Sequence, residues 1–149
     1  LVLLLLLAPT NLMLVSRTTL ALPGRPSPIY RDRDEIRTLD WLSSRVQAND
    51  VILASYASGN YIPAQVGARV FVGHGAESFQ ADEKRTDVAR FFNSSTRDDW
   101  RRELLDRYSV DYVLWGPEER KLGSYDPQTA PYLTRRYGQG DYIVFLVES

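Results

Sequence analysis

The chain has 149 residues, of which 44% are hydrophobic, and its 18 basic and 19 acidic side chains give a formal net charge of −1. A balance this close to neutrality carries no global field that would attract nucleic acid, so we expect no nucleic-acid partner. The lack of cysteine excludes disulfides and thiolate metal sites, and the single histidine, His74, is too few for a histidine-based zinc site. We therefore expect neither a metal nor a cofactor.

The first 22 residues differ in character from the rest of the chain. Leu1–Leu7 are all aliphatic, Leu12–Val15 are again apolar, and the first charge is Arg17. A helix needs about 20 apolar residues to cross a bilayer, and this run supplies roughly three quarters of that length. The run does not begin with methionine. We therefore interpret residues 1–22 as the C-terminal part of a transmembrane helix, with the lipid bilayer as its partner.

Two other interpretations of this leader stay open. It could be a signal peptide without its basic start, with a cleavage site near Ala21, or a core helix buried on all sides. The side of the membrane is also open. The arginines that follow the run favour the cytoplasm, but acidic residues are mixed among them, so the charge rule is indecisive.

Residues 23–31 form a linker, because three prolines between Pro23 and Pro28 prevent a helix from continuing. We expect residues 32–149 to form one soluble α/β domain. Its first helix is predicted from four apolar residues at helical spacing, with Asp32 or Asp34 as the cap and an end near Asn49. Those apolar residues are Ile36, Leu39, Leu42 and Val46.

Three short apolar runs predict buried strands at Val51–Ala54, Ala68–Val72 and Asp111–Trp115. Tyr61–Val66, between the first two strands, is expected to form one or two helical turns. Gly116 and the proline after it should end the third strand.

Two longer helices are predicted between the second and third strands. Asp82 is expected to cap a helix whose apolar residues are Val88, Phe91 and Phe92. Thr96–Asp99 resembles a capping box, with aspartate where glutamate or glutamine is usual. It would open a helix with an apolar face made of Trp100, Leu104, Leu105 and Tyr108.

The C-terminal part of the chain predicts an antiparallel hairpin. Its strands are expected at Tyr132–Tyr137 and Tyr142–Val147, joined by a turn at Gly138–Asp141. Strands that alternate with helices and then end in a hairpin indicate the α/β class. We expect a small three-layer domain with a mainly parallel sheet and an antiparallel C-terminal hairpin.

The candidate site follows from this order of elements. In an open α/β sheet, ligands bind beyond the carboxyl ends of the strands, where three unusual segments should meet. The residues expected there as ligand or acceptor contacts are Tyr56, Gly59, Asn60, His74, Glu77 and Trp115.

Each of these features also has a simpler interpretation. His74 with Glu77 could act as a general base, but no nucleophile accompanies the pair, and a histidine in a glycine-rich loop often makes structural hydrogen bonds. Gly59 and Asn60 could simply form a turn. The acidic residues of the two longer helices fit their first turns better than a metal site, and the arginine pairs at 101–102 and 135–136 fit solvated faces or ion pairs.

Three stretches of the chain resemble a known group of proteins: residues 51–79, 84–93 and 112–120. They are similar to the C-terminal soluble domain of bacterial multi-spanning membrane proteins of the GT-C, mannosyltransferase-like, glycosyltransferase kind. In those proteins a strand leads into a Gly-Asn-x-Ile-Pro loop, and a Gly-His segment follows. The matching residues here are Gly59, Asn60, Ile62, Pro63, Gly73 and His74.

The resemblance implies an accessory extracytoplasmic domain that follows the last membrane helix of an enzyme using polyprenyl-phosphate sugars. Its expected partners are the rest of the same membrane protein and a lipid-linked sugar or glycan acceptor. In GT-C enzymes the catalytic carboxylate lies in the first extracytoplasmic loop, and nothing in this chain corresponds to it, so we assign no catalytic residue. Two alternatives are a non-enzymatic membrane-anchored interaction domain and a secreted hydrolase that uses His74 as its base.

Overall fold

The computed structural model describes residue 16, residues 31–73 and residues 80–148. The chain divides into two compact units, Leu1–Arg33 and Asp34–Ser149. Among the described residues, no helix combines the length and the apolar character needed to cross a membrane. The transmembrane segment expected at residues 1–22 lies outside the described residues, except for Ser16, and stays a prediction.

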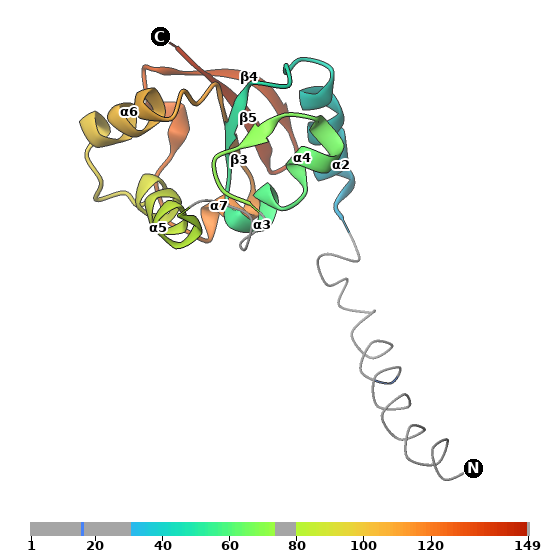
Figure 1. Cartoon of the computed structure of the whole chain (residues 1–149), viewed down its shortest axis with the longest axis horizontal. Helices are drawn as coiled ribbons and strands as arrows, with labels where there is room; N and C mark the ends of the chain where they lie inside the picture. Colours follow the sequence, from blue (N-terminus) through green and yellow to red (C-terminus); the bar gives the residue numbers. More distant parts are fainter. Residues whose placement is uncertain (1–15, 17–30, 74–79, 149) are drawn as a thin grey trace. The chain divides into compact units, whose positions relative to one another are not determined.

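The described strands of the second unit form one mixed five-stranded sheet in the order β2-β1-β3-β5-β4 (Figure 1). The strands β1 (Val51–Leu53), β2 (Arg69–Val70) and β3 (Tyr112–Trp115) run parallel to one another. The C-terminal hairpin consists of β4 (Leu133–Gln139) and β5 (Tyr142–Val147), and β5 pairs with β3 in the antiparallel sense. The expected α/β class is confirmed.

The expectation of a mainly parallel sheet is wrong. Two of the strand pairings are parallel and two are antiparallel, and the longest strands belong to the antiparallel half. The second predicted strand contributes only Arg69 and Val70 to the sheet, at its edge. Ala68, Phe71 and Val72 are buried by side-chain packing without being part of the strand. A short apolar run predicts burial, but it does not say how much of the run pairs with a neighbour.

Helices cover both faces of the sheet (Figure 1). On one face, α2 (Arg33–Ser43) and the short α4 (Ile62–Val66) pack their buried residues against Leu114 and Val144 of the sheet. Helix α2 ends earlier than expected, and Ser44 beyond its end donates its hydroxyl proton to the carbonyl of Trp41 at 2.7 Å. Serine competes for backbone carbonyls in this way and weakens helix continuation.

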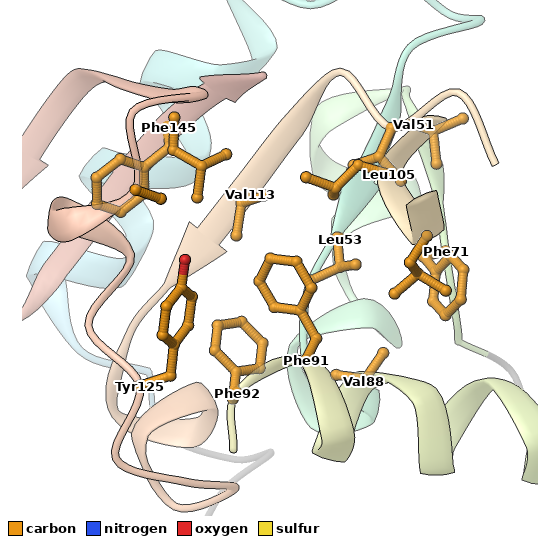
Figure 2. Close-up of a cluster of buried hydrophobic side chains, with 14 of the residues drawn as sticks. Val51, Leu53, Phe71, Val88, Phe91, Phe92, Leu105, Val113, Tyr125 and Phe145 are labelled. Carbon is orange, nitrogen blue, oxygen red and sulfur yellow. The ribbon is translucent and has the colours of Figure 1, made fainter. Parts of the chain in front are cut away.

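On the opposite face, α5 (Ala81–Phe91) and α6 (Asp98–Arg107) cover a core of aromatic and aliphatic side chains. Figure 2 shows Phe91 and Phe92 beside Tyr125, with Leu53 and Val113 of the central strands nearby. The rings of Phe91 and Phe92 meet edge to face, with centroids 5.1 Å apart. This arrangement is favoured by the charge distribution of aromatic rings.

Both capping predictions for these helices are wrong. The residue before α5 is Gln80 in the left-handed region (φ 56°), and Asp82 lies inside the first turn, where the helix dipole favours an acid. Before α6, the hydroxyl of Thr96 donates to the carbonyl of Arg90 at 2.7 Å, so it does not cap the helix.

Arg101 replaces the expected cap in holding the segment between α5 and α6. Its side chain is buried and donates to the carbonyls of Phe91 at 2.8 Å and Asn93 at 2.6 Å. It also forms an ion pair with Asp98 at 2.7 Å, and its guanidinium lies 3.6 Å from the ring centroid of Tyr125. Arg101 is therefore a structural residue and does not belong to a solvated face.

Candidate functional site

The carboxyl ends of β1 and β3 meet at the point where the chain changes direction across the sheet, since β2 lies on one side of β1 and β3 on the other. Ligands of open α/β sheets bind at such a point. Two short helices begin here, α3 (Tyr56–Gly59) after β1 and α7 (Pro117–Arg120) after β3. Ser55 caps α3, because its hydroxyl accepts the backbone N–H of Ser58 at 3.1 Å.

A buried carboxyl group joins these two strand ends. Glu119 is fully buried, and its Oε1 accepts the backbone N–H of Ser55 at 2.8 Å. Its Oε2 accepts the backbone N–H of Gly116 at 2.9 Å. No described arginine or lysine forms an ion pair with Glu119. Glu119 therefore joins the ends of β1 and β3 at the position where a ligand binds in many sheets of this kind.

The loops after β1 and β2 are also in direct backbone contact. A β-carbon built on Gly59 would overlap the carbonyl oxygen of Val72, and one built on Gly73 would overlap the carbonyl oxygen of Gly59. Glycine is needed at both positions because only a residue without a side chain permits this approach. Gly59, predicted as a ligand contact, thus has a packing role.

The aromatic residues predicted for the site carry arginines on their rings. The guanidinium carbon of Arg85 lies 3.4 Å from the ring centroid of Tyr56, and that of Arg120 lies 4.1 Å from the ring centroid of Trp115. The indole nitrogen of Trp115 is buried, and no described group accepts its hydrogen. Each of the two rings thus has one face covered by a cation.

The remaining predicted contacts are described only in part. The backbone N–H of Asn60 donates to the carbonyl of Tyr56 at 3.2 Å and so closes α3. His74 and Glu77 lie outside the described residues. The general base proposed for a hydrolase therefore stays a prediction, as does the ligand contact of all six candidate residues. The described part of the chain contains no group of three acidic or histidine side chains that could hold a metal ion.

Two clefts that the sequence did not predict lie elsewhere on the domain. The first, of about 860 Å³, opens between α5 and α6, where the guanidinium of Arg90 lies 4.1 Å from the ring centroid of Trp100. Asn93 lies at its edge, and the side-chain oxygen of Asn93 accepts the N–H of Ser95 at 2.9 Å. The polar side chains of this cleft bond mainly to their own loop.

The second cleft, of about 460 Å³, lies on the α2 face of the sheet. Trp41 lines it from α2 and Arg45 from the turn after this helix. Tyr112 lies on β3, Leu146 on β5 and Arg136 on β4. Of these five residues, only Arg136 was noted in the sequence, as half of the basic pair at 135–136. Nothing in the local pattern indicates that α2 and β4 bring these side chains together.

Comparison with known proteins adds one finding about the fold. No family model and no curated protein matches the sequence. Among solved structures, the C-terminal globular domain of the oligosaccharyltransferase from Archaeoglobus fulgidus superposes with a TM-score of 0.59 at 16% sequence identity. The match covers 80% of this chain and 99% of that one. The chain therefore shares its fold with the C-terminal globular domain of an oligosaccharyltransferase.

Proposed function

We propose that this chain is an accessory extracytoplasmic domain of a membrane glycosyltransferase-like protein that transfers sugar from a polyprenyl-phosphate donor. The observation that carries the proposal is the fold, which the chain shares with nearly the whole of an oligosaccharyltransferase C-terminal domain. The resemblance at residues 51–79, 84–93 and 112–120 to GT-C proteins supports the same assignment from the sequence.

In this proposal the domain positions the acceptor, and the catalytic carboxylate belongs to another part of the protein. Residues 1–22 anchor the domain in the bilayer, and the nine-residue linker at 23–31 sets its reach. Nine residues in polyproline II geometry, at about 3.1 Å per residue, would give a tether of about 28 Å. A tether of this length holds the domain near the membrane surface, where a lipid-linked donor and a polar acceptor meet.

The proposal is tested by sugar transfer in membranes of the source organism after disruption of the gene that encodes this chain. We expect loss of transfer from a polyprenyl-phosphate donor and recovery on complementation with the intact gene. A gene with a stop codon at Asp32 should restore about a tenth of the activity or less, because the remaining protein lacks the domain that positions the acceptor. The matched control is Arg97→Gln, at a side chain that is 83% exposed, and it should restore full activity. Normal transfer after disruption would contradict the proposal.

The membrane side is tested separately by labelling. This chain has no cysteine, so Arg97→Cys introduces the one thiol of this chain at the exposed start of α6, and any cysteine elsewhere in the full protein is replaced by serine. We expect a membrane-impermeant maleimide to label it in intact cells once the outer envelope is opened. Labelling that requires lysis of the inner membrane would place the domain in the cytoplasm and refute the extracytoplasmic assignment.

A second candidate function is a non-enzymatic, membrane-anchored interaction domain. The observation that favours it is the closed space between β1 and β3, where Glu119 bonds to the backbone on both sides. In that case transfer continues after gene disruption, and the full chain retains a partner in a cross-linking experiment.

A further inference from the structure

The second cleft owes its lining to a β-bulge in β4. Arg135 pairs with Phe145 and Tyr137 pairs with Val144, so Arg136 is the extra residue between two successive pairs of the ladder. In a regular strand, Arg136 and Tyr137 would point to opposite faces. The bulge brings both to the α2 face, where Tyr137 packs against the core and Arg136 lines the cleft. Bulges re-aim side chains in this way and are frequent beside functional sites.

An aromatic pair fixes one wall of the cleft. The rings of Trp41 and Tyr137 are stacked, with centroids 5.0 Å apart and planes 20° apart. Tyr112 and Leu146 form a directly opposed pair on β3 and β5, and both line the cleft. The stacked tyrosine supports one side of the indole in this wall.

The polar groups of the cleft have few partners. Within the described part of the chain, the guanidinium of Arg45 makes no hydrogen bond or ion pair. Arg136 has an ion pair with Glu148, at a distance of 3.7 Å, which is too long for a hydrogen bond. The phenol of Tyr112 is a hydrogen-bond donor at neutral pH. Burial, and after it the negative charges of Asp50 and Asp111, raise its pKa further above the usual tyrosine range.

We propose that the cleft formed by Trp41, Arg45, Tyr112, Arg136 and Leu146 is a saccharide-binding site. The choice of a saccharide rests on the proposed function. Sugar rings need an apolar platform together with donors and acceptors for several hydroxyl groups. The cleft offers aromatic rings, two guanidiniums and a phenol, with the carboxylate of Glu148 beside Arg136.

Size and charge agree with this choice. The volume of about 460 Å³ falls within the range of small-ligand sites, about 300 to 1,000 Å³. A compact dianion such as phosphate fits less well, because Glu148 pairs with Arg136 and the negative charges of Asp50 and Asp111 act on Tyr112 in the same cleft. The ligand expected is a neutral or singly acidic sugar that makes several hydrogen bonds.

The test uses the full chain, 15N-labelled at tryptophan, in a zwitterionic detergent without a sugar headgroup. Three indole signals are expected, from Trp41, Trp100 and Trp115. N-acetylglucosamine, methyl mannoside, glucuronate and inorganic phosphate are titrated separately. At least one sugar should shift the Trp41 signal, with a Kd of about 1 mM, while the other two signals stay in place.

Two substitutions examine the cleft itself. Arg136→Gln and Arg45→Gln should each weaken binding about tenfold, because each removes a charged donor to the ligand. Arg97→Gln, in the cleft between α5 and α6, is the matched control and should bind like the wild type. The unmoved signals of Trp100 and Trp115 report that each variant is folded.

The saccharide assignment is overturned if no sugar shifts Trp41 up to about 50 mM, if phosphate alone shifts it, or if neither arginine variant weakens binding. Its failure differs from failure of the proposed function. Sugar binding together with normal transfer after gene disruption refutes the transferase role and leaves the cleft assignment intact. Lost transfer without sugar binding refutes the cleft assignment alone.

Discussion

The space between the ends of β1 and β3 and the cleft beside α2 differ in how their polar groups are used. At the strand ends, both oxygens of Glu119 bond to backbone N–H groups, and Gly59 touches the backbone of the next loop. In the α2 cleft, Arg45 has no partner among the described residues and Arg136 has a distant one. In the first region the polar groups bond to the backbone and join the strands. In the second region they remain available to bind a ligand.

This difference shows that a fold class suggests where a ligand site can lie but does not establish that one is there. The carboxyl edge of a parallel sheet collects loops, and those loops bind a ligand only when they leave space. Here a side chain of the protein occupies that position. Substitutions in the first region should therefore reduce stability, and substitutions of the two arginines in the second should reduce binding at nearly constant stability.

The largest effect is expected for Glu119→Ala. It leaves the buried N–H groups of Ser55 and Gly116 without an acceptor, at a cost of about 3 kcal/mol in the free energy of unfolding. Urea denaturation measures this value. Glu119→Gln is the matched variant and should cost less, because its amide keeps one accepting oxygen. A loss below about 1 kcal/mol for the alanine variant would show that water or a rearrangement replaces the carboxyl group.

Gly59→Ala comes next, with an expected loss of about 2 kcal/mol. The added methyl group would overlap the carbonyl oxygen of Val72, and backbone atoms move less easily than the end of a flexible side chain. Gly67→Ala is a useful comparison, since an added methyl group meets no atom there and the cost comes only from its positive φ of 75°. Equal urea midpoints for Gly59→Ala and the wild type would refute the close contact between the two loops.

A smaller effect is expected for Trp41→Ala in the α2 cleft. Loss of the stacked pair with Tyr137 should reduce the free energy of unfolding by about 1 kcal/mol and abolish sugar binding. Ile36→Ala, on the same helix at a side chain that is 42% exposed, should change stability by less than about 0.5 kcal/mol. Retained sugar binding in Trp41→Ala would remove the indole from the site.

The smallest effect concerns pH. The raised pKa of Tyr112 means that folding favours its protonated phenol, so this contribution is intact below pH 10 and is lost as the pH rises through the folded-state pKa. Tyr112→Phe lacks the ionisation, and its stability should fall less steeply than that of the wild type above pH 10. Thermal unfolding across the alkaline range measures the difference. Parallel curves would show that the phenol is not protected by burial.

The sequence predicted what depends on neighbouring residues. The apolar runs before Ala54 and before Gly116 placed β1 and β3 close to their true bounds, because a short buried strand bordered by turn residues is a local pattern. The hairpin at 133–147 followed from alternation and glycine in the same way. The short helix α4, of five residues, was also predicted from the sequence.

The sequence did not predict the features that depend on contacts between residues far apart in the chain. Glu119 bonds to a residue 64 positions away, and no periodicity carries that information. Its position after Gly116 and Pro117 is nevertheless typical of a helix start, and that signal could have drawn attention to it. The bulge at Arg136 depends on the register between β4 and β5. The sequence therefore predicted a solvated face or an ion pair for the arginines at 135–136, and it did not predict that Arg136 lines a cleft.

The place of β5 in the sheet has a consequence for biosynthesis. This strand comes last among the described elements, yet it lies between β3 and β4 and joins the parallel half of the sheet to its edge. The sheet cannot close until residues 142–147 have left the ribosome, and pairings between distant segments form slowly. The domain should therefore complete its fold only after translation has passed Val147.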